Sequence, residues 1–222
     1  MWIIGDIHGC QRELNLLLKK LPSEDKLIFL GDYIDRGPDS KSVITRLIKE
    51  SRRSVFLSGN HEEMMLSYFK REGSGDSGLY WTISQNGGDA TMHSYGFSRD
   101  SVWNDLPEDH RYFLENLQLY YEDKNFLAVH AGVKADGPEN LSKQNKNDLL
   151  WIRSDWIKNE SQWKGKHVYY GHTPSYMLNL LPLSRLIEGK KSTGLDTGCV
   201  YGGFLTAYNP ESGEIIQVEN AG

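Results

Sequence analysis

The chain has 222 residues, of which 38% are hydrophobic and 25% charged, and its formal net charge at pH 7 is −5. An acidic balance argues against nucleic acid or an anionic membrane as a partner, because both are bound through an excess of basic residues. The sequence shows no signal-peptide pattern, no apolar run near the ~20 residues that cross a bilayer, and only two cysteines. We therefore expect a cytoplasmic protein. We also expect residues 1–222 to form a single domain.

The N-terminal part of the chain alternates short apolar runs with amphipathic segments. The apolar runs 1–5, 26–30 and 54–57 predict strands, and the segments 11–21 and 40–50 carry apolar residues at helical spacing. Strands that alternate with helices in this way form a βαβαβ unit, in which the strands pair in parallel through right-handed crossovers. A further helix is expected to begin near Glu62.

The rest of the chain predicts a less regular arrangement. Gly73–Gly78 and Lys134–Asp148 are polar segments that we interpret as exposed loops. The other predicted elements are a helix over 107–117, strands over 126–130 and 167–170, and two C-terminal strands within 203–218 joined by a turn at 209–213. These elements together predict an α/β sandwich with a mixed sheet system.

Each apolar strand ends at residues that can bind a metal ion. The residues at these strand ends are Asp6, His8, Asp32, Asn60, His130 and His172. Ligands in open α/β sheets bind beyond the carboxyl ends of the parallel strands, so these side chains are expected to converge. Asp6 and His8 are two positions apart, and in an extended chain they would point to the same side and bind one ion together.

The types of these side chains narrow the choice of metal. Carboxylate, imidazole and amide groups without a thiolate favour manganese, iron or zinc over magnesium or calcium. Six ligands are too many for one ion with an open position, but they suit two ions that share a carboxylate. We therefore predict two divalent or trivalent ions, with manganese as the first choice, whose excess positive charge would activate a water molecule and attract a phosphate.

The motifs around these residues resemble those of a known family. GDIHG at 5–9, GDYIDRG at 31–37 and GNHE at 59–62 resemble the GDxHG, GDxxDRG and GNHE signatures of the serine/threonine phosphoprotein phosphatases, within the calcineurin-like metallophosphoesterases. Further matching motifs follow in the family's order at 129–132, 171–174 and 195–198. The short length and Trp151-Ile152-Arg153 are most similar to compact bacterial and phage members. The resemblance implies a metallophosphoesterase-type sandwich of two mixed β-sheets flanked by helices.

The resemblance also implies a role for each motif residue. The first metal ion would be held by Asp6, His8 and Asp32, and the second by Asp32, Asn60, His130 and His172, with Asp32 as the bridge. His61 would be the general acid that protonates the leaving oxygen, and Asp35 would orient it. Arg36 and Arg153 would bind the phosphoryl oxygens, and Asn60 and His61 would also face the substrate. The implied mechanism is in-line attack by a metal-bridging hydroxide, without a phosphoenzyme.

The implied function is hydrolysis of phosphoserine and phosphothreonine monoesters in proteins. The alternatives are a hydrolase that splits dinucleoside polyphosphates such as diadenosine tetraphosphate symmetrically, a broad-specificity phosphomonoesterase, and a non-catalytic module that binds phosphorylated partners. The substrates would thus be phosphorylated proteins or small phosphate esters and nucleotides. The intact Asp35-Arg36 and Glu62 favour the phosphatase, because the dinucleoside polyphosphate hydrolases tend to vary at both places.

Three residues near the motifs are first interpreted as structural, and the role of a fourth residue, Trp81, is left open. Asp196 is expected to fix a hydrogen bond or a turn rather than to bind metal. Cys10 and Cys199 each follow a motif directly and are interpreted as small buried hydrophobic residues. Trp81 would either frame the substrate cleft or pack between helices.

Overall fold

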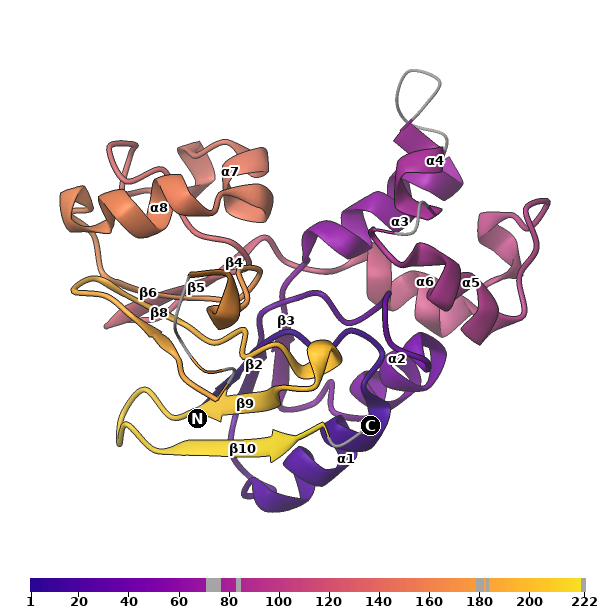
Figure 1. Ribbon diagram of the computed structural model, residues 1–222, viewed down its shortest axis with the longest axis horizontal. Coiled ribbons are helices and arrows are strands. Elements are labelled where there is room, and N and C mark those ends of the chain that lie inside the picture. The colour runs from indigo at the N-terminus through magenta and orange to yellow at the C-terminus, as the bar shows by residue number, and fades with distance from the viewer. Residues whose placement is uncertain (71–76, 83–84, 179–181, 183, 221–222) are drawn as a thin grey trace.

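The computed structural model describes residues 1–222 except 71–76, 83–84, 179–181, 183 and 221–222, and within the described ranges it contains two five-stranded sheets (Figure 1). The strands of the first sheet are β1 (Trp2–Ile4), β2 (Leu27–Phe29), β3 (Ser54–Phe56), β9 (Phe204–Tyr208) and β10 (Ile215–Glu219), in the order β10-β9-β1-β2-β3. The strands of the second are β4 (Tyr120–Glu122), β5 (Phe126–Val129), β6 (His167–Tyr170), β7 (Ile187–Glu188) and β8 (Ser192–Gly194), in the order β4-β5-β6-β8-β7.

Helices flank both sheets. The α-helices are α1 (Gln11–Lys20), α2 (Ser40–Lys49), α3 (Asn60–Lys70), α4 (Ser77–Thr82), α5 (Gly88–Tyr95), α6 (Glu108–Glu115), α7 (Lys146–Trp151) and α8 (Ser154–Asn159). The 3₁₀ helices are η1 (Trp103–Asp105), η2 (Leu141–Lys143), η3 (Glu160–Gln162), η4 (Ser175–Leu178) and η5 (Cys199–Tyr201). In Figure 1, α7 and α8 lie beside the second sheet, and α1 lies beside β10 of the first. Among the described residues, no helix is both long enough and apolar enough to span a bilayer.

The predicted βαβαβ unit is present. Strands β1 and β2 pair in parallel with Ile3 opposite Ile28, and β2 pairs in parallel with β3 with Ile28 opposite Val55. Every residue of β1 and β2 is buried, as expected for central strands whose two faces are both covered. Strand β9 runs antiparallel to β1, so the sheet is mixed, as predicted.

The two sheets pack against each other through a shared apolar layer. Ile3, Ile28 and Leu57 contribute to this layer from the first sheet and its continuation, and Ala128 and Tyr169 contribute from the second. Burial of this layer fixes the orientation of one sheet on the other, since apolar area removed from water stabilises the fold by roughly 25 cal/mol per Å². The predicted α/β sandwich of two mixed sheets is therefore confirmed, and the loops at the strand ends are held in fixed positions.

Three predictions along the chain differ from the structure. Helix α3 begins at Asn60 rather than near Glu62, so the motif residues form its first turn. The segment 134–148 is not a continuous loop, because it contains η2 and the start of α7, where the Asn145 side chain accepts a hydrogen bond from the backbone N–H of Asn147. Of the predicted loop 73–78, residues 73–76 lie outside the described residues, and α4 begins at Ser77.

Candidate metal centre

Asp32 lies at the centre of the predicted ligands. Its Oδ2 is 3.5 Å from Nε2 of His8, and its Oδ1 is 3.4 Å from Nε2 of His130. Its Oδ2 is also 3.9 Å from Nε2 of His61. Asp32 is only 1% exposed. A buried carboxylate with imidazoles at both of its oxygens has the geometry that a bridge between two metal ions requires.

The ligand atoms form two groups that share Asp32. His8, Asp32 and His61 offer atoms within 4.8 Å of one another, and so do Asp32, His130 and His172. Oδ1 of Asn60 lies 3.0 Å from Nε2 of His130, which places this amide in the second group. The second group thus contains all four residues predicted for the second ion.

Asp6 lies next to this centre but outside both groups. Its two carboxylate oxygens accept hydrogen bonds from the backbone N–H of His172, at 3.2 and 3.0 Å. A Cβ at Gly171 would lie 2.1 Å from Oδ1 of Asp6, so only glycine permits this close approach. The chain between Asp6 and His8 is not extended as the sequence argument assumed, because His8 has φ 47°. A shared ion for Asp6 and His8 therefore remains a prediction.

Backbone carbonyls orient two of the imidazole rings. Nδ1 of His8 lies 2.8 Å from the carbonyl oxygen of Ile34, and Nδ1 of His130 lies 2.8 Å from that of Leu30. A carbonyl oxygen only accepts, so Nδ1 of each ring carries the proton and donates it. In the His8 ring, whose pKa burial lowers, Nε2 is then free of a proton and faces Asp32, which is the state that a metal ligand needs.

The charges of the centre are unbalanced without a cation. Burial raises the pKa of Asp6, and the neighbouring charges of Asp196 and Asp32 raise it further. Burial also lowers the pKa values of His8 and His172, so these rings are neutral. Although burial opposes it, the charge of His130 helps to hold the pKa of Asp32 well below its usual range. Crowded buried carboxylates and neutral imidazoles are donors that a metal cation would stabilise, so these residues fit the predicted ions.

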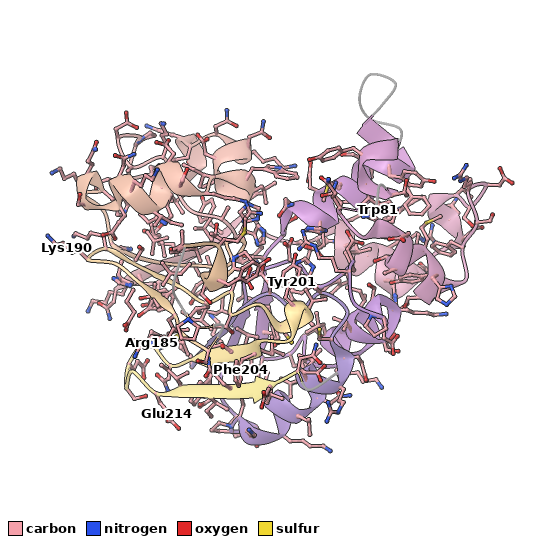
Figure 2. All side chains as sticks on the ribbon, viewed as in Figure 1. Trp81, Arg185, Lys190, Tyr201, Phe204 and Glu214 are labelled. Carbon is pink, nitrogen blue, oxygen red and sulfur yellow. The ribbon has the colours of Figure 1, made fainter. Side chains whose placement is uncertain are left out.

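The imidazole ring of His61 contacts Asp35. Its Nδ1 lies 2.7 Å from Oδ2 of Asp35. The indole N–H of Trp81 donates to the same oxygen at 2.7 Å, and the hydroxyl of Thr91 donates to Oδ1 at 2.6 Å. Trp81 is fully buried, so it packs inside the helical region (Figure 2) rather than framing the cleft. Sequence reasoning missed Thr91, because no motif spacing marks it.

Glu62 connects the motif loops. This buried carboxylate accepts hydrogen bonds from the backbone N–H groups of Asp32, Tyr33 and Gly59, at 2.9, 2.8 and 2.9 Å. A Cβ at Gly59 would lie 2.0 Å from Oδ1 of Asp32, so the two loops could not approach in this way with a larger residue. Glu62 is a motif residue to which the sequence assigned no contact, and the structure shows that it positions the loops.

Backbone strain is concentrated in the predicted site. Among the described residues, those that have a positive φ without being glycine are His8, Asp32, Asp35, Arg36 and His172, with φ from 47° to 72°. All five are predicted site residues. Such conformations cost of order 1–3 kcal/mol each and persist only where the surrounding structure enforces them. Their clustering supports a functional role for this region.

The two predicted phosphate-binding arginines lie beside different ligand histidines. Nη1 of Arg36 contacts Nε2 of His8. Nη1 of Arg153 donates to the carbonyl oxygen of His172 at 2.5 Å. The centre is thus flanked by a guanidinium next to each group of ligands, which suits binding of phosphoryl oxygens between them.

The residues interpreted as structural are buried next to the centre. Oδ1 of Asp196 accepts a hydrogen bond from the backbone N–H of Gly198 at 3.0 Å, which matches the expected turn role. Cys10 and Cys199 are buried, and their sulfur atoms lie within 4.8 Å of each other and of a carboxylate oxygen of Glu13.

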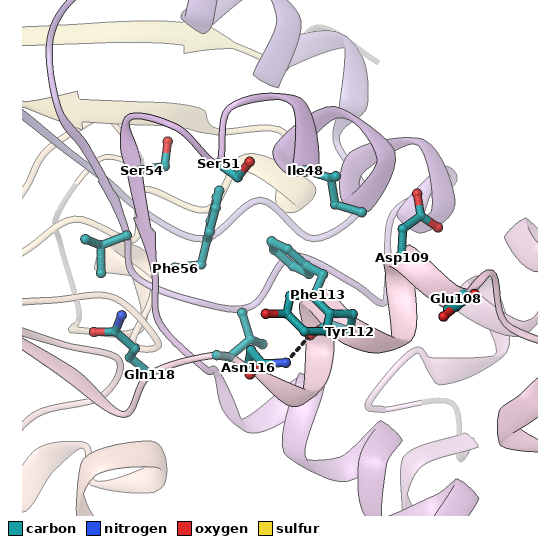
Figure 3. Close-up of a pocket in the computed structure, with 12 residues that line it drawn as sticks. Ile48, Ser51, Ser54, Phe56, Glu108, Asp109, Tyr112, Phe113, Asn116 and Gln118 are labelled. Atoms are coloured by element: carbon teal, nitrogen blue, oxygen red, sulfur yellow. Dashed lines mark hydrogen bonds between the residues drawn. The ribbon is translucent and has the colours of Figure 1, made fainter.

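A separate groove of about 760 Å³ lies between α6 and β3 (Figure 3). Phe56 and Phe113 line it together with polar residues such as Gln118. None of its lining residues is a predicted ligand, so cavity size does not locate the metal centre.

Comparisons with known proteins show which proteins this chain is similar to. A family model described as calcineurin-like phosphoesterase matches residues 1–191. A protein named bis(5'-nucleosyl)-tetraphosphatase PrpE (asymmetrical) from Oceanobacillus iheyensis is 30% identical over 97% of this chain and 90% of its own length. The protein of the same name from Anoxybacillus flavithermus is 29% identical, over 97% of this chain and 92% of its own.

Solved structures share the fold. A crystal structure assigned as a diadenosine tetraphosphatase has a TM-score of 0.71 at 25% identity and covers 98% of this chain and 92% of its own. A serine/threonine phosphatase from Saccharomyces cerevisiae has a TM-score of 0.61 at 16% identity, with coverage of 98% and 78%, and shows a likeness of fold alone. Because the family model spans most of its length, the chain belongs to the calcineurin-like phosphoesterases.

Proposed function

We propose that this phosphoesterase hydrolyses dinucleoside polyphosphates, with cleavage of diadenosine tetraphosphate into ATP and AMP. The support for the substrate is the name of the relatives, which align over at least 90% of both chains. The support for the chemistry is the pair of ligand groups that share Asp32. The proposed substrate is thus a dinucleotide rather than the phosphoprotein that the motifs favoured. The proposed cleavage is asymmetrical rather than symmetrical.

In this proposal, the residues on the two sides of Asp32 would hold two metal ions. One would be held by Asp6, His8 and Asp32, and the other by Asp32, Asn60, His130 and His172. When bound, the ions would supply positive charge that lowers the pKa of a water molecule and neutralises phosphate oxygens. Arg36 and Arg153 would bind the remaining phosphate oxygens and align the scissile bond with the attacking water.

His61 would give a proton to the leaving oxygen. Burial lowers the pKa of His61 to about 3, so the ring is neutral while the site is empty of substrate. The negative charge of a bound polyphosphate would favour the protonated ring, because an opposite charge within a few ångströms stabilises the charged form. Asp35 would hold Nδ1 and leave Nε2 for the proton transfer.

A phosphoserine or phosphothreonine phosphatase is the second candidate. The observation that favours it is the intact arrangement of Asp35, His61 and Glu62, in which every motif side chain has a partner. The residues would then act as above, with the protein hydroxyl as the leaving group.

The test is a direct comparison of substrates. Purified protein with added Mn²⁺ is offered diadenosine tetraphosphate and a set of phosphoserine and phosphothreonine peptides at equal concentrations. We expect ATP and AMP as products, loss of activity on chelation, and a kcat/KM for the dinucleotide at least 100-fold above that for any peptide. Two molecules of ADP, or a preference for the peptides, would contradict the proposal.

A further inference from the structure

Two tyrosines of the described chain form an exposed aromatic corner. Tyr176 is 42% exposed and Tyr201 is 43% exposed. Their ring centroids lie 5.5 Å apart, with an angle of 78° between the ring planes. Single exposed aromatic side chains are ordinary, but exposed rings in contact form a contiguous patch that is a candidate for ligand binding.

This aromatic corner lies next to the metal centre. Tyr176 is in η4, which follows the His172 motif, and Tyr201 is in η5, which follows the Asp196 motif. Figure 2 shows Tyr201 near the middle of the view. The guanidinium carbon of Arg36 lies 5.8 Å from the centroid of the Tyr201 ring, over its face. Because Arg36 also contacts His8, a single guanidinium separates the ring from a predicted metal ligand.

We propose that Tyr201, supported by Tyr176, stacks against the nucleobase of the nucleotide whose phosphate is attacked. Bases stack on aromatic side chains with about 1–3 kcal/mol each, and a neighbouring arginine adds a cation–π contribution. The inference rests on the proposed function, because it concerns the same metal centre and a nucleotide substrate. It adds a binding site for the base, which neither the ligands nor the arginines provide.

The position of the ring also selects the phosphorus atom. Arg36 lies between the Tyr201 ring and the metal centre. With the base on Tyr201, the α-phosphate, which is the phosphate attached to that nucleoside, would therefore reach the metal centre. Water oxygen then bonds to this α-phosphorus, and the bond from the α-phosphorus to the oxygen that joins it to the β-phosphate breaks. The electron pair and a proton from His61 go to the leaving nucleoside triphosphate, and His61 regains a proton from the attacking water. One water is consumed, and the products are a nucleoside monophosphate and a nucleoside triphosphate.

The test compares two product-sized ligands that differ only in the base. Binding of AMP and of ribose 5-phosphate to the Mn²⁺-loaded protein is measured by calorimetry for the wild type, Tyr201→Ala, Tyr201→Phe and Tyr112→Ala. Tyr112 is a matched control, because it is 70% exposed and lines the separate groove near α6. We expect the wild type, Tyr201→Phe and Tyr112→Ala to bind AMP at least about 10-fold more tightly than ribose 5-phosphate, and Tyr201→Ala to bind both alike. An AMP preference that Tyr201→Ala leaves unchanged would overturn the inference.

Turnover of diadenosine tetraphosphate separates this inference from the proposed function. In Tyr201→Ala we expect KM to rise about 10-fold with kcat within about 2-fold, since stacking stabilises substrate and transition state equally. If the wild type fails to cleave the dinucleotide but prefers AMP through Tyr201, the base site stands and the proposed function fails. If cleavage occurs and KM does not respond to Tyr201→Ala, the function stands and the base site is wrong. Thermal unfolding of each variant verifies that it is folded.

Discussion

Oδ2 of Asp35 receives two hydrogen bonds, one from Nδ1 of His61 and one from the indole N–H of Trp81, both at 2.7 Å. A carboxylate that accepts from Nδ1 fixes the tautomer of the imidazole, so Nε2 of His61 faces Asp32 rather than the protein interior. Orientation of the proposed proton donor thus depends on residues from α3, α4 and the loop that follows β2.

Replacement of His61 separates proton transfer from metal binding. We expect His61→Asn to lower kcat by about 10²–10⁴-fold, the range of a lost general acid, with the metal content unchanged. Asp32→Asn is expected to lower kcat as strongly and to lose metal, because its carboxylate lies between both ligand groups. Elemental analysis and steady-state kinetics check both variants. Half of the metal lost from His61→Asn would mean that His61 is a ligand in place of Asp6.

Removal of the Trp81 hydrogen bond tests the support of Asp35. Trp81→Phe keeps most of the buried ring but leaves Asp35 without one donor, and we expect kcat to fall about 10-fold. Trp163→Phe is the matched control, because that buried indole donates to the carbonyl oxygen of Lys166, at 2.8 Å, away from the ligands. Urea unfolding is expected to give a loss of about 1 kcal/mol in both variants. Equal kcat values for the two variants would contradict a role for Trp81 in the site.

Metal removal is expected to destabilise the fold. The buried carboxylates of Asp6 and Asp32 repel each other without a cation, so Mn²⁺ binding favours the native state. At a free Mn²⁺ concentration 100 times the dissociation constant, one site adds about 2.7 kcal/mol to the free energy of unfolding. Thermal unfolding with and without a chelator measures this, and Asp32→Asn should lose most of the effect. A transition temperature that does not depend on Mn²⁺ in the wild type would speak against the site.

Arg36 allows a measurement of the backbone strain. Its φ is 69°, a conformation that glycine adopts freely and alanine does not. Arg36→Gly and Arg36→Ala both lose the guanidinium, so we expect the glycine variant to be more stable in urea unfolding by about 1 kcal/mol. At Arg46, within α2, the same pair of substitutions should give the opposite order, with alanine more stable by about 1 kcal/mol. The same order at both positions would show that Arg36 is not strained.

The convergence of the predicted ligands could be expected from the sequence because these residues lie at strand ends. In a βαβαβ unit the crossovers bring the carboxyl ends of parallel strands together, and this is sufficient to place Asp6, Asp32 and Asn60 near one another. Thr91 and Trp81 could not be predicted in this way. Trp81 reaches Asp35 from α4 and Thr91 reaches it from α5. These contacts depend on how the helices pack, and no regular spacing of residues in the sequence indicates them.

The left-handed backbone conformations of residues in the centre have a consequence for the selection of stabilised variants. At Asp32, Asp35 and Arg36, replacement by glycine would release unfavourable backbone energy while it removes a group that the proposed chemistry needs. A screen for heat resistance alone would therefore enrich inactive proteins with substitutions at these positions. Natural sequences that keep these residues instead of glycine would indicate that selection for turnover outweighs selection for thermal stability at these positions.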